Sequence, residues 1–334
     1  MRRSRRRQIL VAAGTILVAP IMSFPQQATK GARVVMLSDF FYGRWPAENA
    51  NAFRQGLREL GWAEGRNVII EERHAASEEQ RQQIAAEMER NRPDVILACP
   101  PCAVRAKPSG LAPIRGIPIV FFYSDPVAAG LVTSLARPGG DMTGLAYQGI
   151  ELNVKRLQML KESFPKLARV GVLVTKDHAL RNRMVAEIQD AAATLNVKLQ
   201  LFEIARDEPA ERIDAAFEAM ARDGVQAVLG LQGPHFYRER KRVTGLMLKH
   251  RLPGIFDAGE SVDAGALMTY DTNFVDLARR AAGYIDKILK GTKPSELPVE
   301  QPNTFEFAIN LATARSMGVA IPRAVLLRAD RVIE

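Results

Sequence analysis

Cysteine and histidine are scarce in this sequence, which has only two cysteines and four histidines in 334 residues. The histidines include no close-spaced pair; they are His74, His178, His235 and His250. A zinc site needs about four nitrogen, sulfur or oxygen ligands. A site made of Cys99, Cys102 and His178 is conceivable, but these residues come from distant segments, so we predict no metal.

Common catalytic motifs are also missing. No G-x-S-x-G, H-E-x-x-H or P-loop pattern occurs, and "GGDMTGL" (139–145) is a glycine-rich turn that opens no dinucleotide site. We therefore predict a protein that is not an enzyme and needs no cofactor.

No apolar run is long enough to span a bilayer comfortably. The longest, Ile9 to Met22, is interrupted by Gly14 and Pro20 and follows five arginines. Residues 1–28 are therefore predicted to be an export signal, and the signal is expected to be cleaved between Ser23 and Ala32. Residues 6–10, Arg-Arg-Gln-Ile-Leu, favour a twin-arginine signal over an ordinary secretory one. The mature protein is expected to be soluble and periplasmic.

The net charge of +9 belongs largely to this signal. Without the five arginines of residues 1–28, which hold no acidic residue, about +4 remains. No basic cluster is interleaved with aromatic residues, so the sequence predicts no nucleic-acid partner.

From Ala32 onward, apolar strands alternate with amphipathic helices. Strands are expected at 33–38, 94–98 and 117–123, and helices at 46–62 and 126–136. A Gly/Pro-rich stretch, 137–149, separates this series from a second one of the same kind. Such alternation predicts an α/β protein with two doubly wound parallel-sheet lobes.

Ligands bind at the carboxyl ends of the strands in open parallel sheets. The polar and aromatic residues that follow the predicted strands suit a small zwitterion with an apolar body. Many of the same residues are good helix caps or turn formers, so either duty is open for each. The resulting candidate ligand-binding residues are Asp39, Phe40, Cys99, Ser124, Asp125, Tyr147, Lys176, Gln232, Asp257 and Glu260.

Three segments carry a family resemblance: "SDPVAAGLV" (124–132), "ARPGGDMTG" (136–144) and "FEFAINLATARSMG" (305–318). With them, nearly everything after Gly31 resembles the ABC-transporter substrate-binding proteins of the tryptophan/tyrosine type, which have the type I periplasmic binding fold. The resemblance implies two lobes that close on a small organic ligand by a hinge and deliver it to a membrane permease. Lobe I would comprise residues 32–140 and 266–295, and lobe II residues 141–265 and 296–334. The expected protein is a monomer whose ligand is an amino acid or aromatic acid.

The family pattern is kept at Ser124-Asp125-Pro126 and Thr143-Gly144, and Glu260 lies in "GESVDAG", which resembles the family's R-E-F-V-E-A-G. Two segments at the expected cleft depart from it. Relatives usually have T-G where this chain has Cys99 to Cys102, and often N-P-x-N where it has Lys176-Asp177-His178.

Each residue type suggests a role. Asp125 or Asp257 would face a ligand cation, Ser124 and nearby N–H groups would hold an anion, and Phe40 and Tyr147 would pack an apolar body. Lys176 would favour acidic ligands.

Two alternatives stay open. A clamshell of this kind could report its ligand to a membrane receptor instead of a permease. Less favoured is a thiol-disulfide enzyme using Cys99 and Cys102, which could equally form a disulfide that stiffens the pocket wall.

Overall fold

The computed structural model describes residues 31–39, 43–98, 116–149, 151–178, 180–231, 233–301 and 304–334. The predicted export signal, Phe40, Cys99, Cys102 and Gln232 lie outside these ranges, and only the backbone of Asp39 is described. None of the helices in these ranges has the length and apolar character that a membrane crossing requires.

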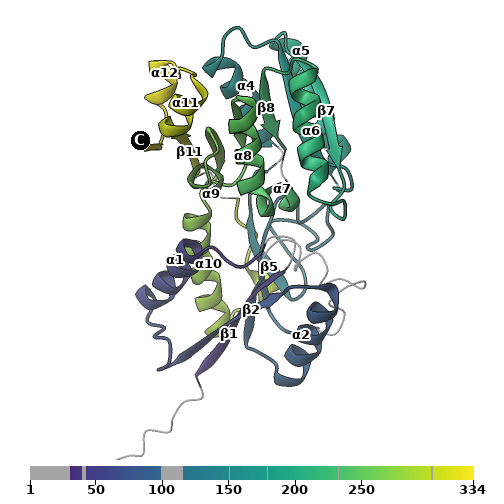
Figure 1. Cartoon of the computed structure of the whole chain (residues 1–334). Helices are drawn as coiled ribbons and strands as arrows, with labels where there is room; N and C mark the ends of the chain where they lie inside the picture. The colour runs from purple at the N-terminus through teal and green to yellow at the C-terminus, as the bar shows by residue number, and fades with distance from the viewer. Residues whose placement is uncertain are drawn as a thin grey trace, which may run out of the picture. The chain divides into compact units, whose positions relative to one another are not determined.

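The first sheet has five parallel strands in the order β2-β1-β3-β4-β5. Its strands are β1 (Ala32–Asp39), β2 (Val68–Ala75), β3 (Val95–Ala98), β4 (Ile119–Tyr123) and β5 (Met142–Ala146). The helices α1 (Ala47–Glu59) and α10 (Phe274–Leu289) pack side by side on one face, and α2 (Glu78–Asn91) covers the other (Figure 1).

Alternation along β1 explains this layering. Val34 and Met36 face the α1/α10 layer, whereas Val35 and Leu37 face α2, and all four are buried. Because successive side chains in a strand point to opposite faces, a strand covered on both sides is apolar throughout.

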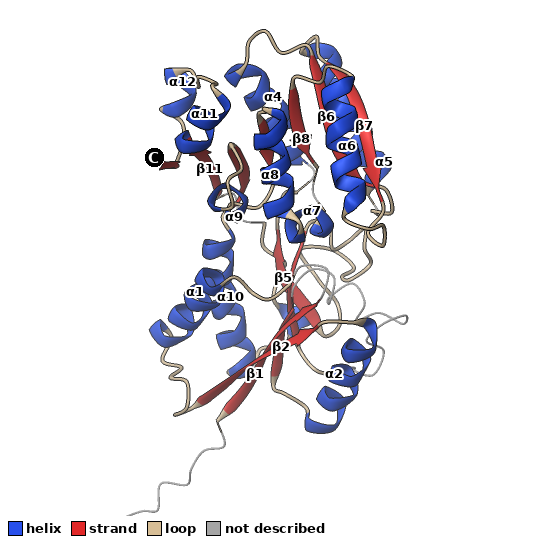
Figure 2. Ribbon diagram, in the orientation of Figure 1, coloured by secondary structure: helices blue, strands red, loops and turns tan. Residues whose placement is uncertain are grey.

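Among the described residues, the second sheet has seven strands in the order β12-β11-β10-β9-β8-β6-β7, in which the β10–β11 pair is antiparallel and the other pairs are parallel. Its strands are β6 (Arg169–Thr175), β7 (Lys198–Ile204), β8 (Ala227–Gly230), β9 (Gly254–Phe256), β10 (Met268–Thr272), β11 (Phe305–Asn310) and β12 (Arg331–Ile333). The helices that accompany it are α4 (Glu151–Ser163), α5 (Arg181–Thr194), α6 (Glu211–Arg222), α7 (Pro234–Arg238), α8 (Arg240–His250), α9 (Glu260–Asp263), α11 (Leu311–Met317) and α12 (Arg323–Leu326) (Figure 2). The predicted α/β class with two doubly wound, mainly parallel sheets is confirmed.

Within the part of the chain that the structure describes, the polypeptide passes between the two sheets three times. It leaves the first sheet after β5, returns between β10 and α10, and leaves again after Glu300, whose carbonyl oxygen accepts the N–H of Ala146 at 2.7 Å. A short 3-10 helix, η1 (Pro294–Glu296), follows α10 and precedes this last crossing. The strand β5 thus belongs to the first sheet and β10 to the second, whereas the predicted boundaries at 140/141 and 265/266 place β5 in lobe II and β10 in lobe I.

The helix expected at 126–136 is absent, and this prediction was wrong. One turn forms, in which the N–H of Ala129 donates to the carbonyl oxygen of Asp125 at 3.0 Å. Gly130 then adopts a φ of +65°, which a right-handed helix cannot continue. The segment proceeds as turns and bends to the next strand.

Candidate functional site

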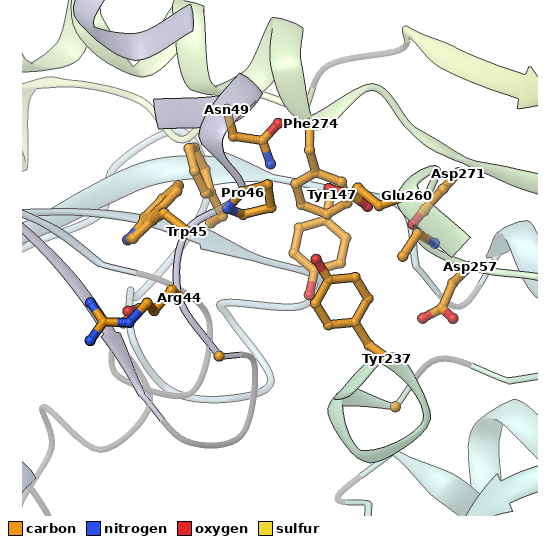
Figure 3. A pocket seen from close by; sticks show the side chains of 15 residues that line it. Arg44, Trp45, Pro46, Asn49, Tyr147, Tyr237, Asp257, Glu260, Asp271 and Phe274 are labelled. Carbon is orange, nitrogen blue, oxygen red and sulfur yellow. Dashed lines mark hydrogen bonds between the residues drawn. The ribbon is translucent and has the colours of Figure 1, made fainter. Parts of the chain in front are cut away.

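A pocket opens where the ends of β1, β4 and β5 meet α7, α9 and the start of α10 (Figure 3). Its space, including the part open to solvent, measures about 710 Å³. That size falls in the range of small-molecule sites, about 300–1,000 Å³. Both sheets contribute to its lining, which consists of Ser38, Gly43, Arg44, Trp45, Pro46, Asn49, Phe122, Tyr147, Gly233, Tyr237, Asp257, Ala258, Glu260, Asp271 and Phe274.

Aromatic rings form most of one wall. Trp45 packs edge-on against Phe122 with ring centroids 5.6 Å apart, and Tyr147 packs against Phe274 at 5.2 Å. Tyr237 reaches the pocket from α7, and the guanidinium of Arg240 lies 4.5 Å above its ring. Such a wall suits a ligand with a flat apolar body.

Carboxylates lie on the side opposite Trp45 (Figure 3). The fully buried Arg156 approaches Asp271 at 3.3 Å, while its other nitrogens donate to the Tyr270 carbonyl and the Asn153 amide oxygen at 2.7 Å. Asp271 also accepts the N–H of Ala258 at 2.7 Å. Its charge is therefore satisfied within the protein and serves to orient this wall.

Asp257 is held differently. Burial and the nearby Asp271, opposed by Arg156, together raise the pKa of its carboxyl to about 7. The N–H groups of Gly233 and of Asp257 itself donate to the carboxylate. A carboxyl in this state can accept a ligand cation and gains charge when it does so.

Glu260 is the other acid on this wall. Burial, Glu48 and Asp271 raise the pKa of its carboxyl. Arg44 is the basic residue among the lining side chains; it is exposed, and its guanidinium points away from the carboxylates (Figure 3). The described lining is therefore acidic on one side and aromatic on the other.

A helix N-terminus completes the site. The helix α1 begins at the pocket, and its N-cap residue, Pro46, provides no side-chain acceptor for the first N–H groups. Unpaired N–H groups at a helix start attract anions. This feature gives the pocket one place for a negative group.

The sequence-predicted residues are distributed as follows. Tyr147, Asp257 and Glu260 line the pocket together. Asp125 accepts the N–H of Ala128 at 3.0 Å and pairs with Arg183 of α5 at 3.3 Å, and Ser124 lies beside it, outside the lining. Lys176 is exposed and also outside the lining, so its expected bias towards acidic ligands finds no support in the pocket.

Sequence reasoning missed three aromatic side chains of the pocket, two of which lie at helix starts. Trp45 precedes α1, Phe274 opens α10 after its cap Asn273, and Tyr237 lies on the short α7. For Trp45 and Phe274 the usable signal was an aromatic residue next to a helix start, since helix N-termini converge with strand ends at the same edge of the sheet. Tyr237 is the fourth residue of α7 and carries no such signal.

A family model described as "ABC transporter substrate binding protein" matches residues 46–333. The tyrosine-binding protein of Clostridioides difficile (strain R20291) is 24% identical over 269 residues, which cover 79% of this chain and 75% of that protein. A solved structure of a conserved domain protein from Vibrio cholerae has a TM-score of 0.78 at 24% identity, covering 91% of this chain and all of that one. An ABC domain from Streptococcus pneumonia solved with L-Trp also has a TM-score of 0.78, at 21% identity and the same coverage.

Proposed function

Because the chain belongs to the family of ABC transporter substrate-binding proteins, we propose that it binds an aromatic amino acid between its two sheets and delivers it to an importer permease. The aromatic side chain would pack among Trp45, Tyr147 and Phe274. The ammonium would face Asp257 and Glu260, and the carboxylate the uncapped start of α1.

The observation that carries this proposal is the opposition of an aromatic wall and an acidic wall across one pocket, with a helix N-terminus beside them. An amino acid presents the same three features: an apolar body, a cation and an anion. The tyrosine-binding protein and the structure solved with L-Trp support the assignment. The ligand is then held without any catalytic step.

We further propose that the mature protein is monomeric and works in the periplasm, exported through residues 1–28 by the twin-arginine route. Two lobes, each built around one of the sheets, would close on the ligand by bending where the chain passes between the sheets. Closure removes the ligand from water, which strengthens its contacts with the buried carboxylates.

Titration calorimetry tests the proposal. L-tyrosine, L-tryptophan and L-phenylalanine should bind, whereas L-alanine, which lacks the aromatic body, and 3-phenylpropionate, which lacks the ammonium, should bind far more weakly. The variant Phe274→Ala should weaken aromatic binding by about tenfold or more, since a lost aromatic contact removes a large buried area. Phe305 of β11 lies outside the pocket, so the matched control variant Phe305→Ala should leave the affinity for aromatic amino acids unchanged. No binding of any aromatic amino acid would refute the proposal.

A further inference from the structure

A second space adjoins the aromatic pocket. It measures about 530 Å³, including its open part, and shares Asn49, Glu260, Asp271 and Phe274 with the pocket. Its remaining lining comes from α1, β10, β11, β12 and the loops around α9 and α10, and consists of Glu48, Gly259, Thr272, Asn273, Val275, Glu306 and Arg331. We call this space the annex.

Hydrogen-bond acceptors dominate the annex. Four carboxylates line it, those of Glu48, Glu260, Asp271 and Glu306. Its one basic residue, Arg331, is already paired with Asp263 at 2.8 Å and with Glu306 at 3.3 Å. The groups that remain available for a ligand are therefore chiefly oxygen atoms that need a donor.

The net charge of the annex lining also favours a positively charged ligand group. Arg331 and the buried Arg156 offset two of the four carboxylates. The starts of α1 and α10 add roughly half a positive charge each. Asn273 already caps α10 through the N–H of Asp276 at 2.9 Å, so this contribution is partly used. About one negative charge is left uncompensated by this count.

Two buried polar atoms give independent support. Asn49 and Thr272 line the annex and are only 6% and 3% exposed, and the amide oxygen of Asn49 and the hydroxyl of Thr272 have no hydrogen-bond partner among the described residues. A buried polar atom without a partner costs free energy unless a ligand or water satisfies it. Both atoms are able to accept a hydrogen bond, so a donor-rich group in the annex would satisfy them once their side chains turn towards it.

We infer that the annex is a second subsite, which binds a protonated amine or guanidinium at the far end of a ligand whose aromatic body occupies the main pocket. The ligand class is thus an aromatic group joined to a basic chain, such as a dipeptide of an aromatic and a basic residue. This inference rests on the proposed function, because the aromatic body must lie in the main pocket for the basic end to reach the annex.

A matched pair of dipeptides tests it. L-Trp-L-Lys and L-Trp-L-norleucine have side chains of similar length, and only the first ends in an ammonium. In calorimetry the wild type should bind Trp-Lys about tenfold more tightly than Trp-norleucine, as expected for one charge-assisted hydrogen-bonded contact. Glu48→Gln removes one annex carboxylate outside the aromatic pocket and should reduce Trp-Lys affinity by a larger factor than it changes L-tryptophan affinity.

The hydroxyl of Thr272 allows a sharper comparison. Thr269, on the same strand, also has a buried hydroxyl without a described partner, but lines neither space. Valine is nearly isosteric with threonine, so Thr269→Val and Thr272→Val should both raise the melting temperature. Only Thr272→Val should also weaken Trp-Lys binding, by about threefold to tenfold.

The outcomes separate the two proposals. If L-tryptophan binds but Trp-Lys gains nothing over Trp-norleucine, or if both valine variants leave Trp-Lys affinity unchanged, the annex inference is wrong and the aromatic site stands. If neither dipeptide nor any aromatic amino acid binds, the proposed function itself fails.

Discussion

Replacing Asp257 by asparagine should change how the stability of the protein depends on pH. Burial and the neighbouring Asp271 hold the pKa of the Asp257 carboxyl near 7 in the folded chain, against an ordinary value of 3.8. Between these two values the folded state keeps a proton that the unfolded state has lost. The free energy of unfolding therefore falls as pH rises through this window and levels off above it.

The size of the effect follows from the shift. Each unit of pKa is worth about 1.4 kcal/mol, so a shift of this size corresponds to about 4 kcal/mol. Asp257 is half-buried, so solvent screens part of this penalty, and we expect about 2 kcal/mol. Asparagine is neutral at every pH and keeps the shape, so Asp257→Asn should be more stable than the wild type at pH 8 by about this amount. At pH 4 the two proteins should be nearly equal.

Urea unfolding at pH values from 4 to 8 measures this directly. The difference between wild type and variant isolates Asp257, because all other groups titrate in both proteins. A difference that stays constant with pH, or a wild type that gains stability relative to the variant as pH rises, would show that burial does not keep this carboxyl protonated. Binding of an aromatic amino acid should release a proton from the wild type near pH 6, and much less from the variant.

Two further substitutions test the framework of the site. Arg156→Met leaves a buried carboxylate without its cation and should cost about 3–5 kcal/mol of unfolding free energy, whereas the same change at the exposed Arg183 should cost little. Gly144→Ala would put a Cβ 2.1 Å from the Phe121 carbonyl oxygen and should lower the melting temperature severely, whereas Gly245→Ala in α8 meets no atom within 4 Å and should raise it slightly.

The sheets could be predicted because the apolar residues of each strand are enough to identify it as a buried strand. Val34 to Leu37 and Ile119 to Phe122 are continuous apolar runs, as strands covered on both faces require. Ser77 caps α2, since its hydroxyl accepts the N–H of Gln80 at 3.2 Å, and serine is a common residue at a helix start. The helix predicted at 126–136 does not form, because Gly130 leaves the helical region after one turn. Composition alone does not reveal this change of backbone conformation.

The site could be predicted only in part. The rule that ligands lie beyond strand ends places Tyr147, Asp257 and Glu260, which do line the pocket. The same rule also selects Asp125, whose carboxylate instead caps a turn and pairs with Arg183. Tertiary packing decides between these outcomes, because only it determines which strand ends face the other sheet.

The central claim is that an aromatic ligand binds against Trp45, and the tryptophan content allows a direct measurement. The chain has two tryptophans, and Trp62 lies outside the pocket, where its indole N–H donates to Asp286 at 2.9 Å. In Trp62→Phe, Trp45 is therefore the only fluorescent tryptophan. Titration with L-tyrosine should change the Trp45 emission saturably, with the same Kd that calorimetry gives. Calorimetric binding of L-tyrosine with no change in that emission would contradict the account.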